Sequence, residues 1–475
     1  MNNKKTLLTA AITAAVLLPA TVFASGYKLN EQSAAGMGTA HAGRAAMAED
    51  ASVVFYNPAA MTELDRAQMT AGFTYINGVG EFTGNARDAG FAEITGDDTD
   101  GDGYNNGGNY LGESFIPFFY YARPINETFS VGLGVFVPFG TNTDYDDDFV
   151  GGAFADETSL SSIEIAPTFA YKINDQLSIG GGIDIVHMEG TLSKSVDTIP
   201  SAVNAAYAGF ENHFEVSGDD WGYGWNVGTF YKLDEATTLA VTYRSEIEFT
   251  LEGDSEFAND FSYYDSGSGT IVNLGTVRPQ ASKVPITTPA SATLSATHQF
   301  SDALLLQMGA TWTGWSSFEY FDVIATENLA DATIPDVSDI AAINGLGNGY
   351  IGHIVEKWED VWALAVGGTY KLNDTIAVRA GYAYDQSPVT DEYRTARVPS
   401  SDRQWLTAGV QYVVNADLSI DVAAGYLYME KMSLTETNKD LNDETIELAP
   451  GVAVNVTGEY EIDVFGLSAQ VNYKF

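Results

Sequence analysis

Evenly spaced acidic side chains mark one stretch of the sequence that could hold a metal ion. Asp98, Asp100 and Asp102, followed by Gly103, match the opening of a calcium loop, in which alternate carboxylates point at the ion. The twelfth position of that loop is Asn109, which lacks the second carboxylate oxygen of a glutamate. The sequence therefore favours an acidic, solvated loop, keeps these aspartates as a calcium alternative, and predicts no cofactor.

The sequence contains no recognisable catalytic motif. There is no cysteine, and neither a G-x-S-x-G turn nor an H-E-x-x-H helix occurs. Gly222 and Gly224 precede a strand, so they do not form a nucleotide loop. The histidines follow no ligand spacing; they are His41, His187, His213, His298 and His353. We therefore predict that the protein is not an enzyme.

Three arginines stand in segments where apolar residues alternate with small or polar ones: Arg244, Arg379 and Arg403. The alternation places each on the polar face of a strand. A guanidinium binds a carboxylate through two parallel hydrogen bonds and keeps its charge. We predict that each either contacts a carboxylate ligand or pairs with a nearby acid, for example Arg244 with Glu246 or Arg403 with Asp402.

The C-terminal segment FGLSAQVNYKF indicates which elements position such side chains. Apolar residues occupy one parity of residues 465–475 and end in Phe475, whereas glycine or polar residues occupy the other. Strict alternation over this length is typical of a membrane β-barrel strand with lipid outside and a polar lumen inside. A soluble edge strand is rarely as long.

Short polar turns recur between these alternating segments. Asn and Asp suit such turns because their side chains bond the local backbone. Intervals of roughly 40 to 65 residues separate the turns, which fits two strands and a long loop in each interval. The six turns separate seven hairpins and predict fourteen strands; they lie at 122–128, 171–176, 231–236, 299–303, 370–375 and 411–416.

The first residues predict export. Lys4 and Lys5 precede an apolar run, and Val22-Phe23-Ala24 is typical of a cleavage site, so residues 1–24 are expected to be a signal peptide. No stretch of eighteen apolar residues follows. The formal net charge of −42 disfavours nucleic acid, whose binding rests on phosphate neutralisation. We expect an all-β protein of the outer membrane of a Gram-negative bacterium.

Residues 25–64 do not alternate and predict a plug. Asn57 is a suitable helix N-cap, and Pro58 suits the first helical position. A fourteen-stranded barrel is too wide for its own side chains to fill. We therefore predict a fourteen-stranded antiparallel outer-membrane β-barrel, residues 65–475, with this N-terminal hatch in its lumen.

Two further features bear on how a molecule would enter and leave the lumen. Val203, Tyr207 and Phe210 have helical spacing, and this amphipathic helix either covers an apolar entry site or packs against a neighbouring loop. Prolines interrupt three neighbouring predicted strands, and two glycines add freedom to the middle one, which favours an opening in the wall. These residues are Pro117, Pro138, Pro167, Gly132 and Gly134.

Five segments of the chain resemble one family over residues 25–475: residues 25–52 with FYNPAAM, WGYGWNVGTFYKLDE, LAVTYRSEIEF, AYDQSPV and VPSSDRQWLTAGVQY. They are similar to the FadL-type outer-membrane long-chain fatty acid transporters. The resemblance implies a fourteen-stranded barrel with an N-terminal hatch and passive uptake of hydrophobic molecules. It also implies a groove between the third and fourth extracellular loops, a deeper pocket, and an inward kink in the third strand.

The resemblance assigns roles to particular residues. Gly26, Tyr27, Lys28 and Leu29 would reach the deeper pocket, and Asn57, Pro58 and Ala59 would form the hatch signature. Asp322 departs from the pattern, which carries a lysine near this position.

Three functions stay open: uptake of long-chain fatty acids, uptake of aromatic hydrocarbons, or an adhesin or phage receptor without dedicated cargo. Expected partners are the cargo, outer-membrane lipid and lipopolysaccharide, and the barrel-assembly machinery, which would engage Phe475. We expect a monomer.

Overall fold

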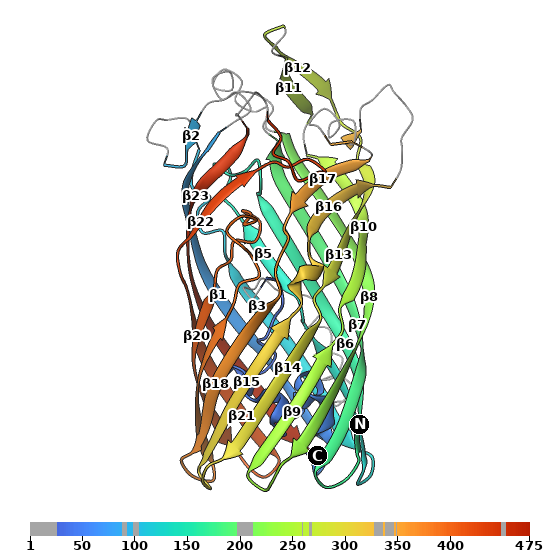
Figure 1. Cartoon of the computed structure of the whole chain (residues 1–475), viewed down its shortest axis with the longest axis vertical. Coiled ribbons are helices and arrows are strands. Elements are labelled where there is room, and N and C mark those ends of the chain that lie inside the picture. Colours follow the sequence, from blue (N-terminus) through green and yellow to red (C-terminus); the bar gives the residue numbers. More distant parts are fainter. Residues whose placement is uncertain are drawn as a thin grey trace.

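The structure is a computed structural model, and it describes residues 26–87, 93–97, 104–196, 212–258, 260–265, 268–326, 336–337, 346–347, 349–447 and 453–475. Within these ranges the strands close into an antiparallel barrel of fourteen wall strands (Figure 1). The fold class predicted from the sequence is confirmed. Among the described residues, no helix is both long and apolar enough to cross a membrane.

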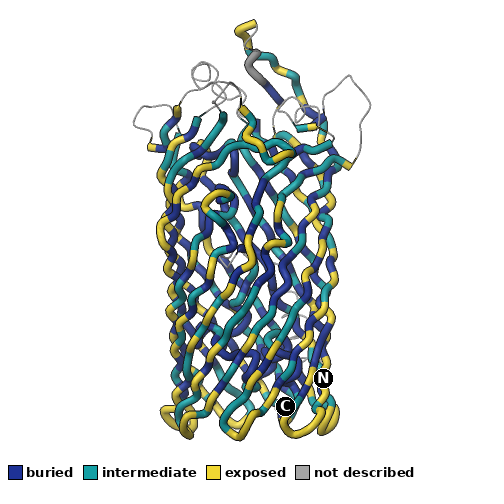
Figure 2. Tube along the Cα trace, in the orientation of Figure 1, coloured by how far each residue is buried: buried dark blue, intermediate teal, exposed yellow. Residues whose placement is uncertain are grey.

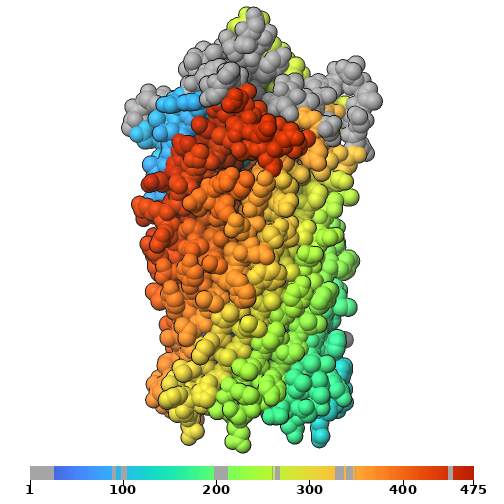
Figure 3. Space-filling model, in the orientation of Figure 1, coloured from blue at the N-terminus to red at the C-terminus, as the bar shows by residue number. Residues whose placement is uncertain are grey.

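Eight wall strands are continuous. They are β1 (Gln68–Arg87), β3 (Glu113–Pro124), β6 (Glu157–Lys172), β7 (Leu177–Val196), β8 (Asn212–Lys232), β19 (Ile376–Asp385), β20 (Arg403–Val413) and β23 (Asn455–Lys474). The barrel closes where β1 pairs with β23, from Gln68 opposite Lys474 to Arg87 opposite Asn455. The space-filling view shows a closed wall on the face formed by the later strands, coloured from green to red (Figure 3).

Six wall strands are broken into two segments. They are β4 (Phe129–Phe136) with β5 (Gly140–Asp144), β9 (Thr237–Arg244) with β10 (Ile247–Phe257), β14 (Ser291–Gln299) with β13 (Gln280–Thr288), β15 (Leu304–Thr313) with β16 (Tyr320–Ala325), β18 (Val361–Lys371) with β17 (Tyr350–Val355), and β21 (Leu418–Met429) with β22 (Met432–Thr437). At the rim, the short strand β2 (Glu93–Thr95) pairs antiparallel with the end of β1, and β11 (Phe261–Asp265) pairs with β12 (Thr270–Gly275) above the rim (Figure 1).

Side chains alternate along the wall as the sequence predicts. On β23, Phe465 and Leu467 are more than 40% exposed, whereas Ser468 and Gln470 are at most 2% exposed. The same alternation runs along other strands (Figure 2). The residues that face outward are apolar because they meet lipid, and the polar residues face the lumen.

All six predicted turns lie at one end of the barrel, opposite the long loops (Figure 1). In the turn between β3 and β4, Asn126 Oδ1 accepts hydrogen bonds from the backbone N–H groups of Thr128 and Phe129, each at 2.9 Å. Asn174 and Asn373 accept equivalent bonds in their turns. The recurring Asn therefore fixes each turn by replacing a backbone partner.

The hatch lies inside the half of the barrel nearer these turns (Figure 1). Its helices are α2 (Ala34–Met37), η1 (Arg44–Ala46), α3 (Val53–Tyr56) and η2 (Pro58–Glu63). Asn57 Oδ1 accepts the Ala59 N–H at 3.1 Å, so Asn57 caps η2, which is a 3-10 helix. Asn57 Nδ2 donates to the carbonyls of Ala45 (2.7 Å) and of Thr229 on β8 (3.0 Å), which joins the hatch to the wall.

Wall glycines bring the hatch backbone against the barrel. A Cβ on Gly381 would lie 2.1 Å from the carbonyl carbon of Thr39, and one on Gly180 would lie 2.5 Å from the Ala59 nitrogen. Atoms do not approach so closely, so each position requires glycine while the hatch is seated. At these positions the backbone of the hatch therefore packs directly on the backbone of the barrel.

We predict that Gly180→Ala loosens the hatch and leaves the barrel assembled. The added methyl group overlaps hatch backbone, and overpacking of this kind costs about 1–3 kcal/mol. Limited proteolysis of the folded protein should then cleave within residues 26–64 faster than in the wild type. Gly368→Ala is the matched control, because its Cβ would lie no nearer than 3.3 Å to a neighbouring atom. Equal cleavage rates in both variants would contradict the packing account.

Candidate functional site

The third wall strand turns into the lumen between β4 and β5. Phe136 pairs with Glu164 and Gly140 pairs with Ser161, so three residues, 137–139, stand opposite two residues of β6. All three are buried. Such an extra residue bends a strand. The inward kink that the resemblance implies in this strand is therefore present.

The start of the described chain is bonded to this kink. The Leu29 N–H donates to the Pro138 carbonyl at 2.9 Å, and the Gly140 N–H donates to the Tyr27 carbonyl at 2.8 Å. Lys28 and Phe139 face each other in this short antiparallel bridge. The kink and the N-terminal segment thus complete each other's backbone hydrogen bonds.

A strip of wall beside the kink is not paired. β3 pairs with β1 over Glu113–Ala122, but it pairs with β4 only over Phe119–Pro124. β5 pairs with β6. Above the strip, the Asp144 N–H donates to the Tyr110 carbonyl at 2.9 Å, which closes the gap again. The seam between β3 and β5 is therefore the weakest line in this part of the wall.

The residues expected at a wall opening lie only partly here. Pro138 is in the kink, and Pro117 is in the half of β3 away from β4. Gly132 and Gly134 lie below it, where β4 is paired on both sides, and a Cβ on Gly132 would lie 2.6 Å from Val54 of the hatch. In the structure Gly132 makes room for the hatch, and the flexibility expected of the two glycines stays a prediction. Pro167 pairs with Leu133 of β4, but the ladder between β6 and β7 skips Ala166 and Pro167, as expected of a residue without a backbone N–H.

The N-terminal segment inserts an aromatic ring into an apolar pocket. Tyr27 is buried with ring centroids 4.7 Å from Trp315, 5.5 Å from Phe318 and 5.7 Å from Trp358. A cavity of about 30 Å³ adjoins this cluster, and its apolar lining includes Tyr27, Leu160, Leu192, Val216, Leu251 and Ile286. We call this space the inner cavity. Gly26 has a left-handed φ of 62°, and a Cβ there would overlap both tryptophans.

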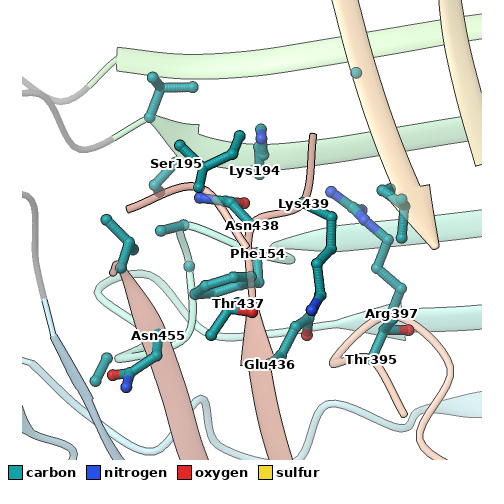
Figure 4. Close-up of a pocket in the computed structure, with 18 of the residues that line it drawn as sticks. Phe154, Lys194, Ser195, Thr395, Arg397, Glu436, Thr437, Asn438, Lys439 and Asn455 are labelled. Carbon is teal, nitrogen blue, oxygen red and sulfur yellow. The ribbon is translucent and has the colours of Figure 1, made fainter. Parts of the chain in front are cut away.

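A larger cavity of about 610 Å³ opens at the end of the barrel with the long loops (Figure 4). We call it the outer cavity. Its wall combines aromatic and aliphatic side chains, among them Phe149, Phe154 and Phe214, with charged ones. The basic residues of the lining are Arg87, Lys194, Arg394, Arg397 and Lys439, and the acidic ones are Asp148, Glu392, Glu436 and Glu447.

The three arginines predicted from the sequence all form buried ion pairs. Arg244 lies 2.6 Å from Glu164 and 2.8 Å from Asp184. Arg403 lies 2.7 Å from Asp385. The pairing of Arg244 with Glu246 suggested by the sequence is therefore wrong, and the partner of Arg403 is Asp385 and not Asp402. The partners of Arg244 stand on strands 60 to 80 positions away, and the partner of Arg403 lies opposite it on the preceding wall strand.

Arg379 links the hatch to the wall. Its guanidinium contacts Asp421 of β21 and lies 3.2 Å from Glu49 of the hatch. Glu49 also lies 2.9 Å from Arg44, so one hatch carboxylate bridges two arginines. These arginines hold the structure together, and none of Arg244, Arg379 and Arg403 lines either cavity.

Two charged groups of the N-terminal segment lie close to these pairs; Glu31 is buried and Lys28 is half-buried. Burial lowers the pKa of Lys28 to about 8, with a further decrease from the Arg244 charge and an opposing effect of Asp385. Burial raises the pKa of Glu31 to about 7 against the effect of its backbone hydrogen bonds, one of which is from the Asn30 N–H at 2.9 Å. This segment is therefore held by groups that change charge near neutral pH.

The carboxylate of Asp322 pairs with the neighbouring side chain of His353. Its Oδ1 lies 2.6 Å from His353 Nδ1, and the other nitrogen of His353 lies 3.5 Å from Asp443. Lys357 Nζ lies 2.5 Å from the same Asp443. The acid that departs from the expected lysine is thus part of a mixed-charge cluster, and it lines neither cavity.

Several predicted residues lie outside the described residues: Val203, Tyr207, Phe210, Asp98, Asp100 and Asp102. Asn109, the twelfth residue of the calcium alternative, is described. Its Oδ1 accepts the N–H groups of Gly80 (2.9 Å) and Leu111 (3.3 Å), so this oxygen is already used by the backbone. In the described part of the chain no cluster of His, Asp and Glu is arranged to hold a metal ion.

An antiparallel barrel with an internal hatch, an interrupted wall strand and an apolar inner cavity defines an outer-membrane transporter of hydrophobic molecules. The family model described as "Outer membrane protein transport protein (OMPP1/FadL/TodX)" matches residues 15–475. The chain belongs to this family.

Relatives agree in length as well as in sequence. The long-chain fatty acid transport protein of Escherichia coli O6:H1 is 28% identical over 451 residues, which cover 91% of this chain and 94% of that protein. Outer membrane protein P1 of Haemophilus influenzae is 27% identical and is covered to 98%, as is this chain.

Solved structures share the fold. A Pseudomonas aeruginosa FadL homologue has a TM-score of 0.78 at 26% identity, covering 95% of this chain and 100% of that chain. The Pseudomonas putida toluene transporter TodX has a TM-score of 0.60 at 18% identity, with coverage of 95% and 100%. At 18% identity, the similarity to TodX shows a shared fold only.

We predict that docking of the N-terminal segment weakens as pH rises through about 7. Glu31 has a pKa raised from 4.5 to about 7, so its contribution to docking is complete below about 4.5 and is lost as pH rises through about 7. Hydrogen exchange of the amides of residues 27–32 should therefore be faster, after correction for intrinsic rates, at pH 8 than at pH 5. Glu31→Gln should remove this pH dependence, and an unchanged dependence in that variant would contradict the assignment.

Proposed function

We propose that this protein takes up long-chain fatty acids, or closely similar amphipathic acids, by passive diffusion across the outer membrane. The observation that carries the proposal is the charge of the outer cavity. The whole chain has 22 basic and 64 acidic residues, yet five basic and four acidic residues line this cavity. An apolar wall with concentrated cations suits a molecule that has an alkyl chain and a carboxylate.

The relatives support the same cargo. Proteins named for long-chain fatty acid transport align over nine-tenths of this chain, and the P. aeruginosa FadL homologue has a higher TM-score than the toluene transporters. A neutral aromatic hydrocarbon would gain nothing from the cations of the outer cavity. Uptake of aromatic hydrocarbons is therefore the second candidate, and an adhesin or phage receptor without cargo does not explain the two cavities.

The path runs through the two cavities to the kinked strand. An acid first enters the outer cavity, and its chain then displaces the N-terminal segment from the inner cavity around Tyr27. Displacement of Tyr27 breaks the bond to Gly140, because the same residue supplies the carbonyl. The kink is then free to move, and the cargo leaves sideways through the seam between β3 and β5. Only apolar surface and lipid lie beyond that seam, so the chain avoids water.

The remaining assignments accompany this proposal. Cleavage after Ala24 leaves the N-terminal segment a short, free end that can leave the inner cavity. Phe475 ends the last strand and is the contact for the barrel-assembly machinery. The protein acts as a monomer in contact with outer-membrane lipid and lipopolysaccharide, and it catalyses no reaction.

We predict that a strain lacking its own fatty acid uptake protein takes up labelled oleate when it carries this protein. The double variant Asn57→Ala, Pro58→Ala should take up much less. It loses a helix cap worth about 1 kcal/mol and two hydrogen bonds of about 1 kcal/mol each, so the hatch no longer holds the N-terminal segment against the kink.

Assembly is the control for this variant. Wild type and variant should reach the outer membrane in equal amounts and show the same heat-dependent mobility on gels. Normal oleate uptake by the variant would count against a role of the hatch in transport. Uptake of toluene and not of oleate by the wild type would favour the aromatic cargo.

A further inference from the structure

Arg397 is a buried arginine whose hydrogen bonds go to uncharged groups. It lies in the loop between β19 and β20 and is 5% exposed. One terminal nitrogen donates to the Glu157 carbonyl (3.3 Å) and the Thr158 hydroxyl (3.1 Å), and the other donates to the Ser193 carbonyl (3.1 Å). Its Nε has no hydrogen-bond partner among the described residues. These three hydrogen-bond acceptors are uncharged, so none of them neutralises the positive charge of the guanidinium.

The other buried arginines differ in this respect. Within the described parts of the chain, Arg397 alone among them has no carboxylate within 4 Å; the paired ones are Arg44, Arg379, Arg394 and Arg403. A buried charge without a counter-ion is costly, so proteins seldom keep one without a use. An anionic ligand would supply the missing partner.

The position of Arg397 suits such a ligand. It is part of the lining of the outer cavity and of the inner cavity. In the close-up, Arg397 rises from its loop beside Thr395, whereas Glu436 and Thr437 reach the outer cavity from β22 (Figure 4). A molecule with its head at Arg397 would have its chain directed at the apolar residues around Tyr27. Lys28, which also has no carboxylate within 4 Å in the described chain, lines neither cavity.

The acids near Arg397 leave its charge available. Glu356 also lines the inner cavity, but its oxygens accept the Trp358 indole N–H (2.7 Å) and the Thr395 hydroxyl (3.2 Å). Burial raises the pKa of Glu356 to about 8, which keeps it mostly uncharged at pH 7. Glu436 accepts the Ala396 N–H at 2.8 Å, and Asp156 and Lys194 are the further charges that act on this region. Burial raises the pKa of Glu436 to about 7, so Glu436 is only partly charged at pH 7 and is the acid that a ligand would meet.

We propose that Arg397 receives the carboxylate of the cargo at the passage from the outer to the inner cavity and thereby sets a preference for acids over neutral lipids. This inference rests on the proposed function. The guanidinium gains a charged partner from the ligand that it lacks within the protein, and its free Nε provides a second donor beside a terminal nitrogen. Arg397 thus occupies the role for which the sequence offered Arg244, Arg379 and Arg403.

Binding of two ligands to the purified full-length protein tests the proposal. Oleate carries a carboxylate, and oleyl alcohol has the same chain with a neutral head. Arg397→Met should weaken oleate binding roughly 10- to 100-fold, the value of one charge-assisted hydrogen-bond pair, and should change oleyl alcohol binding little. Arg66→Met is the control, because it removes a cation at the opposite end of the barrel, where Arg66 pairs with Asp417 and lines neither cavity; its oleate affinity should stay near the wild-type value.

A second variant covers the case in which Arg397→Met does not fold. At pH 8, where Glu436 is mostly charged, Glu436→Gln removes that charge, so it should strengthen oleate binding and leave oleyl alcohol binding unchanged. Equal losses of both ligands in Arg397→Met, no loss of oleate, or an equal loss in Arg66→Met would overturn the proposal, as would unchanged oleate binding in Glu436→Gln. A wild type that binds neither ligand would instead refute the proposed function itself.

Discussion

Two backbone hydrogen bonds, from Leu29 to Pro138 and from Gly140 to Tyr27, join the N-terminal segment to the kink of the third wall strand. Each side of this bridge is incomplete alone. A strand bent into the lumen leaves backbone groups that the neighbouring strand cannot reach, and buried groups of this kind must find partners. The N-terminal segment supplies them and places Tyr27 among the aromatic residues of the inner cavity. Cargo that takes the place of Tyr27 therefore acts on the wall directly.

The hatch gives the bridge a fixed base. Asn57 ties it to β8, wall glycines bring its backbone against the barrel, and Glu49 connects Arg44 with Arg379. Buried ion pairs contribute little net stability but penalise a partner left alone. The paired arginines thus make removal of the whole hatch costly, whereas the short segment 26–32 is held by fewer contacts and by Glu31, whose charge changes near neutral pH. Local release of that segment is the easier motion.

Local rules of the sequence predicted most of the fold. Alternation gave the direction of side chains, Asn and Asp gave the turns, and Asn57-Pro58 gave a capped helical turn. Each depends on residues near one another in the chain. Partners on strands that are not neighbours could not be predicted in this way: Glu164 reaches Arg244 from a strand 80 positions earlier. Asp385 faces Arg403 in the register of two consecutive strands, which the sequence does not fix by itself. The packing of the hatch on Gly132 was missed because Val54 and Met61 are more than 70 positions away.

Arg397 was missed for the same reason, since its loop shows no alternation and most of its partners are carbonyls, which any residue could provide.

The whole account depends on the link between the N-terminal segment and the wall. Lys28 and Phe139 form a non-hydrogen-bonded antiparallel pair, whose Cα atoms lie about 4.5 Å apart, within reach of a disulfide. The chain has no cysteine, so Lys28→Cys with Phe139→Cys gives one defined cross-link. Oleate uptake measured before and after reduction is the most direct measurement: we expect the oxidised protein to be blocked and the reduced protein to recover, whereas equal uptake in both states would contradict the account.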